Sequence, residues 1–312
     1  MNQDKIIVVM GGPSSEAVIS RQSGAAVLKA LQSAGCNAAG LEFVPETFSA
    51  DVQASGARFV FNAMHGKFGE DGLVQAALEL LGIPYTGSGV LASALTMDKA
   101  AVKRFFLAEG ISTPHSRTYR KQDMRRYLIG EIRGEFSLPV VVKAATQGSS
   151  IGVFIVEQAD QLQEALQEAF RYSDEALVEE FIAGKELTVA VWGDERHYEA
   201  LPIIEITTAS GRYDYDSKYT KGASTHIIPA GIPEETAARV REMALRIFGI
   251  CGCRGVARID MMLGADGTPY VIDVNSVPGM TELSLVPDAA RADGIAFPAF
   301  CMRLLELAGF RQ

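Results

Sequence analysis

Apolar and polar positions along the first part of the chain predict short strands that alternate with helices. The apolar run at residues 5–10 ends at two glycines and predicts a buried strand, and a helix to about residue 34 follows it. Short strands are predicted near Leu41 and Phe59, and a second helix over residues 72–81. Alternating strands and helices joined by glycine turns indicate a small parallel α/β domain.

The pattern changes near residue 97, where longer polar stretches separate the elements. Gly110 ends one predicted helix, and Pro114 prevents its continuation. The elements predicted from there on are, in order, a helix over 99–109, strands over 138–143 and 152–156, a helix over 159–172, strands over 176–181, 187–192 and 197–206, a polar loop over 211–222, and helices over 233–248 and 297–307.

Residues 258–275 predict a hairpin that carries chemistry. Two apolar strands are joined at Asp266-Gly267, a dipeptide suited to a two-residue turn. Such a turn places four polar side chains on one face in two opposed pairs, Asp260 with Asp273 and Arg258 with Asn275. Facing carboxylates repel, and a hard divalent cation such as Mg²⁺, which usually brings substrate phosphates with it, would compensate. An exposed polar face on an edge hairpin is the alternative.

Composition and charge are those of an ordinary globular protein. The 312 residues, 48% hydrophobic and 21% charged, suffice for two or three domains. A net charge of -9 argues against binding to a nucleic-acid backbone. Neither a membrane span nor the apolar core of a signal peptide is present, and the four cysteines lack zinc-type spacing. A cytoplasmic protein with reduced thiols, without nucleic-acid or membrane partners, is expected.

Two lysines and one connection between strands are candidate nucleotide contacts. Lys143 precedes a loop of small residues whose N–H groups can approach a phosphate, although a plain hairpin explains the segment equally well. Lys99 opens a helix within reach of a phosphate, but an exposed first-turn lysine is the commoner case. Residues 179–186 suit an adenine edge and a ribose, or form a charged connection between domains.

Glu16 and His65 both follow predicted strands, at the position where open α/β sheets bind ligands. The alternative for each is a capping or surface residue. Gly87-Ser-Gly89 imitates a dinucleotide-binding fingerprint, but it does not follow the first strand of its domain, and no acid clearly marks the next strand end. We reject it.

Two loops of the final third complete the candidate chemistry. Residues 213–219 carry three tyrosines in a polar loop of the length typical of lids, with plain surface charge as the alternative. Pro278-Gly279 precedes a helical segment, and free N–H groups there suit a carboxylate or a developing oxyanion, although an ordinary turn is the simpler explanation. Together the candidates indicate phosphate, metal and a small anionic substrate.

In order along the chain, these segments resemble the ATP-grasp superfamily and, within it, the D-alanine–D-alanine ligases. The most specific segments are HGKFGEDG (65–72), YTGSGVLASALTMDK (85–99), GSSIGV (148–153), YDYDSKYT (213–220) and NSVPGMTELSLVP (275–287). The resemblance implies an α/β protein, α+β in its ATP-binding part, with three domains. These are an N-terminal parallel α/β substrate domain (1–95), a central ATP-grasp domain (96–182) and a C-terminal ATP-grasp domain with metal site and lid loop (183–312).

The resemblance also implies a reaction and a set of cofactors. ATP would phosphorylate a first D-alanine, and the amino group of a second would attack the acyl phosphate, giving D-alanyl-D-alanine for peptidoglycan. The enzyme would be a cytoplasmic homodimer. The expected ATP contacts are Lys99, Lys143, Glu179, Ile182, Glu186 and Lys218. The expected ligands of two Mg²⁺ ions, or of Mn²⁺ in their place, are Asp260, Asp273 and Asn275.

Substrate contacts follow from the same resemblance. Glu16 would hold the ammonium of the first D-alanine in a network with Ser149 and Tyr219, and His65 would orient substrate. The groups expected around the second D-alanine and the oxyanion are Arg258, the backbone of Gly279, Ser284 and Leu285.

The chain departs from the family pattern at several positions. Asp273 stands where the family usually has Glu, Ala144 where it has Pro, Gln147 where it has Glu, and Arg21 where it has an apolar residue. A ligase for a different amino-acid pair, or a nucleotide-binding regulatory protein with weakened catalysis, therefore stays open. Tyr219 favours a dipeptide product over D-alanyl-D-lactate. A nicotinamide-dependent oxidoreductase rests only on the rejected Gly87 segment.

Overall fold

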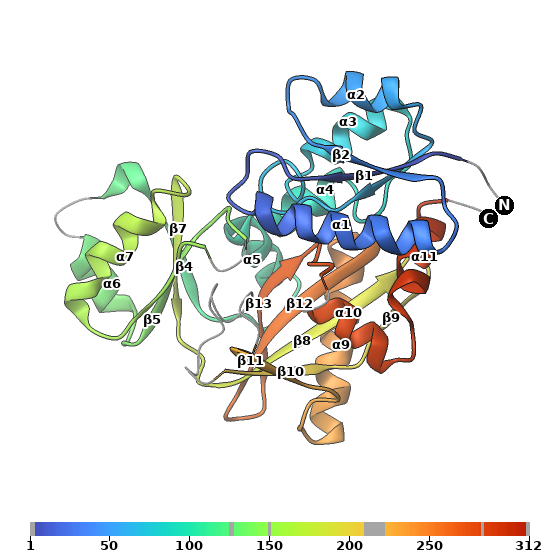
Figure 1. The fold of residues 1–312 in the computed structure, drawn as a ribbon. Helices are drawn as coiled ribbons and strands as arrows, with labels where there is room; N and C mark the ends of the chain where they lie inside the picture. Colours follow the sequence, from blue (N-terminus) through green and yellow to red (C-terminus); the bar gives the residue numbers. More distant parts are fainter. Residues whose placement is uncertain (1–3, 125–127, 149–150, 209–221, 282–283, 310–312) are drawn as a thin grey trace.

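Three separate sheets organise the chain (Figure 1). The computed structural model describes residues 4–124, 128–148, 151–208, 222–281 and 284–309. The strand orders of the three sheets are β2-β1-β3, β4-β7-β5-β6 and β11-β10-β8-β12-β13, with β9 paired to β8. Within these residues no helix is long and apolar enough to cross a bilayer.

The first sheet confirms the predicted parallel α/β arrangement. Strand β1 (Ile6–Met10) runs parallel to β2 (Ala38–Glu42) on one side and to β3 (Phe59–Asn62) on the other. Its side chains are buried on both faces because helices cover both. Helix α1 (Ala17–Ser33) packs on one face; α2 (Phe48–Ser55) and α3 (Leu73–Leu81) pack on the other. The loops after β1 and β3 therefore open at the same edge of the sheet.

The second sheet is antiparallel and is covered by helices on one face. Its strands are β4 (Ser116–Arg120), β5 (Val140–Ala144), β6 (Val153–Val156) and β7 (Glu175–Glu180). Helices α6 (Leu128–Glu135) and α7 (Leu162–Ala169) pack against them, and 3-10 turns lie at Lys121–Asp123 and Ala159–Gln161. The sequence pattern missed β4 and α6. Strand β4 buries only Tyr119, and α6 contains two glycines, which weaken a helical signal.

The third sheet is covered on both faces. Its strands are β8 (Gly184–Gly193), β9 (Tyr198–Ala200), β10 (Ile204–Thr208), β11 (Ser224–Ile227), β12 (Gly255–Gly264) and β13 (Pro269–Asn275). Helix α9 (Glu234–Ile250) and part of α5 (Lys99–Ala108) cover one face, while α10 (Leu285–Ala292) and α11 (Phe297–Leu307) cover the other. The single strand predicted over 197–206 is two strands, interrupted near Pro202, which has no N–H to donate.

The hairpin β12–β13 has the predicted register but not the predicted turn. Asp260 pairs with Asp273, and Arg258 pairs with Asn275. The turn is longer by one residue: Gly264 N–H donates to the carbonyl of Thr268 at 2.9 Å, leaving residues 265–267 as the loop. A register shift after Asp260 passes over Ile272, so the bulge cancels the extra loop residue.

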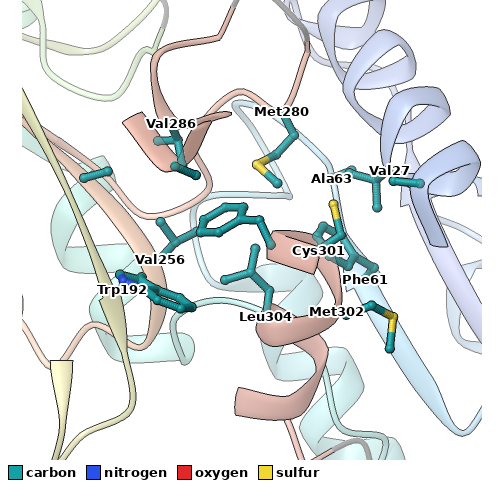
Figure 2. Packing of buried hydrophobic residues seen from close by; sticks show 14 of the residues in the cluster. Val27, Phe61, Ala63, Trp192, Val256, Met280, Val286, Cys301, Met302 and Leu304 are labelled. Carbon is teal, nitrogen blue, oxygen red and sulfur yellow. The ribbon is translucent and has the colours of Figure 1, made fainter. Parts of the chain in front are cut away.

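One apolar core joins the two ends of the chain. Figure 2 shows Val27 of α1 and Phe61 of β3 close to Cys301 and Leu304 of α11. The ring centroids of Trp192 and Phe300 lie 5.7 Å apart in the same cluster. The first and third sheets are thus held together by α1 and α11 packing on each other. The three domain ranges stay a prediction.

Candidate active site

Glu16 lies where the part of the chain that contains the first sheet meets the part that contains the second sheet. It directly precedes α1 and is only 3% exposed. A methyl group added at Gly66 would lie 2.8 Å from its Oε1, and one added at Gly148 would lie 2.7 Å from the same atom. The carboxylate therefore contacts the loop after β3 and the loop after β5 at once. A Cβ at either glycine would displace the carboxylate of Glu16.

His65 holds two distant segments together. Its Nδ1 lies 3.1 Å from the carbonyl of Val277, and its Nε2 lies 2.9 Å from Ser23 Oγ. A carbonyl only accepts, so Nδ1 carries the proton and Nε2 accepts from the serine. Burial lowers the pKa of His65 to about 4, a carbonyl hydrogen bond opposes this, and the charge of Arg258 lowers it further. The ring is neutral at neutral pH.

Glu70 belongs to the site, although the sequence analysis did not single it out. It is 7% exposed, and Gly66 N–H donates to its Oε2 at 2.8 Å. Burial raises its pKa well above the usual value, and the charge of Glu16 raises it further. The available signal was its place in the glycine-rich segment 65–72. Burial and the neighbouring charge of Glu16 therefore favour the protonated form of this side chain.

Lys99 connects α5 to the acidic hairpin. The side chain of Asp98 caps α5 by accepting from Ala101 N–H at 2.9 Å. Lys99 Nζ then lies 3.1 Å from Asp273 Oδ1 and donates to the carbonyl of Gln147 at 2.8 Å. It is 7% exposed, so it is not the surface lysine of the alternative interpretation.

Glu179 is shared by two buried lysines. Lys143 Nζ lies 2.7 Å from its Oε2, and Lys103 Nζ lies 3.1 Å from its Oε1. Burial raises the pKa of Glu179, but the charges of Lys143 and Lys103 outweigh this and hold it below its usual value. Two cations around one carboxylate leave a net positive charge, which suits a phosphate. Lys103 was not predicted, because its partners Thr113 and Glu179 lie on other elements.

The connection between the second and third sheets carries the other predicted nucleotide contacts. Ile182 lies just after β7 and is half-buried, and Glu186 lies on β8, opposite Met262 of β12. Glu179, Ile182 and Glu186 therefore follow one another across the junction of the two sheets, as expected from their spacing. This is the location predicted for adenine and ribose.

The polar face of the hairpin is held by a network centred on Asp260. Arg258 donates to both of its oxygens, at 2.8 and 2.7 Å. Thr188 Oγ1 donates to Oδ1 at 2.6 Å, and Asn275 Nδ2 donates to Oδ2 at 3.2 Å. Each acidic ligand predicted here thus has a cation against it, Arg258 at Asp260 and Lys99 at Asp273. Carboxylate and amide oxygens on one face suit a hard cation.

The segment after β13 brings Gly279 next to Ser284. A methyl group on Gly279 would lie 2.8 Å from Ser284 Oγ. That hydroxyl accepts from Thr281 N–H at 2.9 Å, and Ser284 precedes the first residue of α10, Leu285. The neighbouring Met280 N–H donates to Ser23 Oγ at 3.2 Å, so the segment is tied to α1 and, through Ser23, to His65.

One small cavity receives residues from all three structural units. It is lined by Glu70, Thr96, Met97, Lys99, Gly148, Asp273, Val274, Asn275 and Ser276. Among the residues that the structure describes, no group of three or more His, Cys, Asp or Glu is arranged for a metal. The predicted Ser149, Lys218 and Tyr219 lie outside the described residues.

Comparisons with known proteins agree with this arrangement. A family model for the D-ala D-ala ligase C-terminus matches residues 105–306, and one for the N-terminus matches residues 32–88. The D-alanine–D-alanine ligase of Desulforudis audaxviator is 47% identical over 311 residues, covering 97% of this chain and 98% of the relative. That of Moorella thermoacetica is also 47% identical, with coverages of 97% and 99%.

Solved structures give the same result and confirm the ATP-grasp fold. D-alanine–D-alanine ligase from Bacillus anthracis matches with a TM-score of 0.83 at 34% identity, covering 98% of this chain and 97% of that one. The same ligase complexed with ATP gives 0.82 at 33% identity, with the same coverages. VanG D-Ala:D-Ser ligase from Enterococcus faecalis gives 0.83 at 29% identity, covering 98% and 100%.

Proposed function

The chain belongs to the D-alanine–D-alanine ligase family, and we propose that its cavity carries out the ATP-dependent ligation of two D-alanines for peptidoglycan precursor synthesis. One observation supports this most directly. The buried cation Lys99, the hairpin residues Asp273 and Asn275, and Glu70 line a single cavity, although they come from separate parts of the chain. Phosphoryl transfer needs this combination, because the protein mainly positions groups and neutralises charge.

In the first step, a carboxylate oxygen of the first D-alanine attacks the γ-phosphate of ATP. The bond from that phosphorus to the β,γ-bridging oxygen breaks, giving an acyl phosphate and ADP.

Lys99 and Lys143 would contact the phosphates, since both are buried cations near the expected nucleotide site. Glu179, Ile182 and Glu186 would hold adenine and ribose, and Lys218 would cover the γ-phosphate. Glu16 would hold the substrate ammonium, with Ser149 and Tyr219 in the same network.

In the second step, the amino group of the second D-alanine attacks the carbonyl carbon of the acyl phosphate. The tetrahedral intermediate loses inorganic phosphate, and the amine gives up its proton to leave the peptide bond. Arg258 and the N–H of Gly279 would stabilise the oxyanion. Ser284 and Leu285 would receive the carboxylate of the second substrate. His65 contributes by fixing the segment that carries Gly279.

Asp260, Asp273 and Asn275 would hold Mg²⁺, because their oxygens share one face of the hairpin beside the cavity. Bound there, the ions would neutralise the phosphates during transfer. Lys99 and Arg258 already compensate the two carboxylates, so the protein itself keeps this acidic face stable.

A ligase that joins D-alanine to a different acceptor is the second candidate. The observation behind it is that a D-Ala:D-Ser ligase matches the fold as well as a D-alanine ligase does. Fold alone therefore does not choose the second substrate.

We also propose a cytoplasmic homodimer. All four cysteines are free thiols, which suits a reducing compartment, and the reaction consumes ATP. Helix α3 exposes Leu73 and Leu80, seven residues apart and thus on one face, at 53% and 90%. Light scattering should give a mass twice that of the 33.5 kDa chain, and Leu80→Glu should shift the measured mass toward that of a single chain.

Phosphate release from ATP with Mg²⁺ and D-alanine tests the function, with products identified by mass. Release with D-alanine alone, and a D-alanyl-D-alanine product, is the expected result. Release only when D-serine or D-lactate is added would show that the second substrate is that compound and not D-alanine. ATP binding without release for any pair, L-alanine included, would favour a regulatory protein instead.

A further inference from the structure

A hydrogen-bonded pair of side chains, His226 and Asp288, lies beside the first turn of α10. His226 of β11 donates from Nδ1 to Asp288 Oδ2 at 2.6 Å, and Arg291 Nη2 donates to Asp288 Oδ1 at 2.6 Å. Asp288 is only 9% exposed, whereas the Arg291 side chain is 70% exposed. Burial raises the pKa of Asp288, but the hydrogen bond from His226 and the charges of Arg291 and His226 outweigh this, so its pKa lies below the usual value.

Asp288 is joined to the residue expected to meet substrate. Its backbone N–H donates to the carbonyl of Ser284 at 3.2 Å, the first hydrogen bond of α10 after its start. Fixing the Asp288 side chain therefore fixes the turn that begins at Ser284 and Leu285. The other face of α10 is held by apolar packing of Val286 and Ala290, which is strong but not directional. A directional contact is needed to set the rotation of the helix.

Charge gives the pair a second effect. An acidic side chain in the first turn of a helix competes with any substrate carboxylate for the same N–H groups and repels it. Because His226 and Arg291 occupy both oxygens of Asp288, that negative charge is directed away from the helix start and is compensated. Without His226, the carboxylate would be free to turn toward the helix start.

We propose that His226 is a positioning residue for the second substrate: through Asp288 it fixes the first turn of α10, where Ser284 and Leu285 receive the substrate carboxylate. This rests on the proposed function for the role of Ser284 and Leu285. The contact between His226 and Asp288 does not, since it is a feature of the fold alone. His226 reaches this helix from β11, the edge strand of its sheet.

Steady-state phosphate release over a D-alanine series wide enough to separate first-site from second-site saturation tests the proposal. His226→Leu should raise the second-site KM about tenfold, because it removes the hydrogen bond that His226 donates to the Asp288 carboxylate. The first-site KM and the KM for ATP should stay within about twofold, because Glu16 and Lys143 lie on other elements, just before α1 and on β5. An unchanged second-site KM, or an equal rise in all three constants, would overturn it.

Three matched variants sharpen the result. His226→Asn keeps a side-chain N–H near the position of Nδ1 and should hold the second-site KM within about twofold of wild type, whereas Asp288→Leu should match His226→Leu. Arg291→Gln removes the exposed partner of the same carboxylate and should change little. A loss with Arg291→Gln as large as that with His226→Leu would contradict the role given to His226.

Hydrogen exchange reads the positioning without any turnover. The N–H groups of Leu285, Val286 and Asp288 should exchange faster in His226→Leu than in wild type, while α9 stays unchanged. Equal exchange in the two proteins would overturn the inference even if the acceptor proves to be another amino acid. Absence of any ligation by the wild-type protein would instead count against the proposed function, so the two failures are distinguishable.

Discussion

At the scale of single residues, burial favours the neutral forms of both His65 and Glu70. The pKa of His65 falls to about 4, so its neutral form is favoured in the folded protein, while that of Glu70 rises and its neutral form is favoured too. The stability that His65 contributes is fully present above its pKa in the unfolded chain and is lost as pH falls through its lower pKa in the folded protein. Stability from Glu70 is full below its unfolded pKa and is lost as pH rises through its folded value.

His65→Asn tests this sign. Between an unfolded pKa of roughly 6.5 and a folded pKa of about 4, protonation favours the unfolded chain, so the free energy of unfolding of wild type should fall on acidification. Urea unfolding at pH 7 and pH 4.5 should show a loss about 2 kcal/mol larger in wild type than in His65→Asn. The exposed His197, changed to Asn, is the control and should behave as wild type.

Asp260→Asn should reduce ligation at least about a hundredfold, because it removes the charge that balances Arg258 and that would bind Mg²⁺. Phosphate release at limiting Mg²⁺ measures it. The matched control is Asp266→Asn, an exposed acid at the tip of the same hairpin, which should be near normal. Near-normal turnover of Asp260→Asn would remove this residue from the site.

Residues named by local motifs were predictable, and residues defined by distant partners were not. Glu16 and His65 lie at strand ends, where the alternation of strands and helices directs attention. Lys103 resembles any helical lysine until the fold brings Glu179 to it from another element. The sequence therefore predicts which loops carry the site better than which side chains complete its charge balance.

At the scale of elements, the sequence predicted best where burial produces either a continuous apolar run or a helical period. Strand β1 and helix α9 have such patterns and were expected close to their observed bounds. Edge strands such as β4 and β11 show little apolar pattern, because they bury few side chains. The predicted pairing of the hairpin residues was confirmed, but the predicted two-residue turn was wrong. The longer turn and the bulge at Ile272 compensate each other.

Gly148→Ala tests how closely two elements approach at Glu16. The new methyl group would lie 2.7 Å from Oε1 of Glu16 and should displace that carboxylate, raising the first-site KM for D-alanine about tenfold with little change in melting temperature. The control is Gly130→Ala in α6, where a Cβ meets nothing within 4 Å and should stabilise by about 0.5–1 kcal/mol. An unchanged first-site KM would contradict the proposed role of Glu16.

At the scale of the whole molecule, the core in Figure 2 makes the first and third sheets depend on each other. Its members include residues of α1 and β3 near the start of the sequence, of β8 in its middle and of α11 near its end. Sequence patterning marks these residues as apolar but does not state which faces meet. The two sheets should therefore unfold in one transition rather than one after the other.

Phe300→Ala tests this coupling. Phe300 is fully buried against Trp192, so its loss should lower the free energy of unfolding by about 3–5 kcal/mol. Fluorescence of Trp192, the only tryptophan, and far-UV circular dichroism should still give coincident transitions. The exposed Leu107, changed to Ala, should cost less than about 0.5 kcal/mol. Separate transitions in wild type would contradict a shared core.

The bulge at Ile272 has a consequence for how the hairpin tolerates changes in length. Because it separates the tip at residues 265–267 from the edge that carries Asp260 and Asp273, an added residue at the tip need not rotate those carboxylates to the other face. Ala265 and Asp266 are exposed, so an inserted peptide would extend into solvent. The tip is therefore a suitable place to attach a fluorescent reporter that follows the hairpin during turnover.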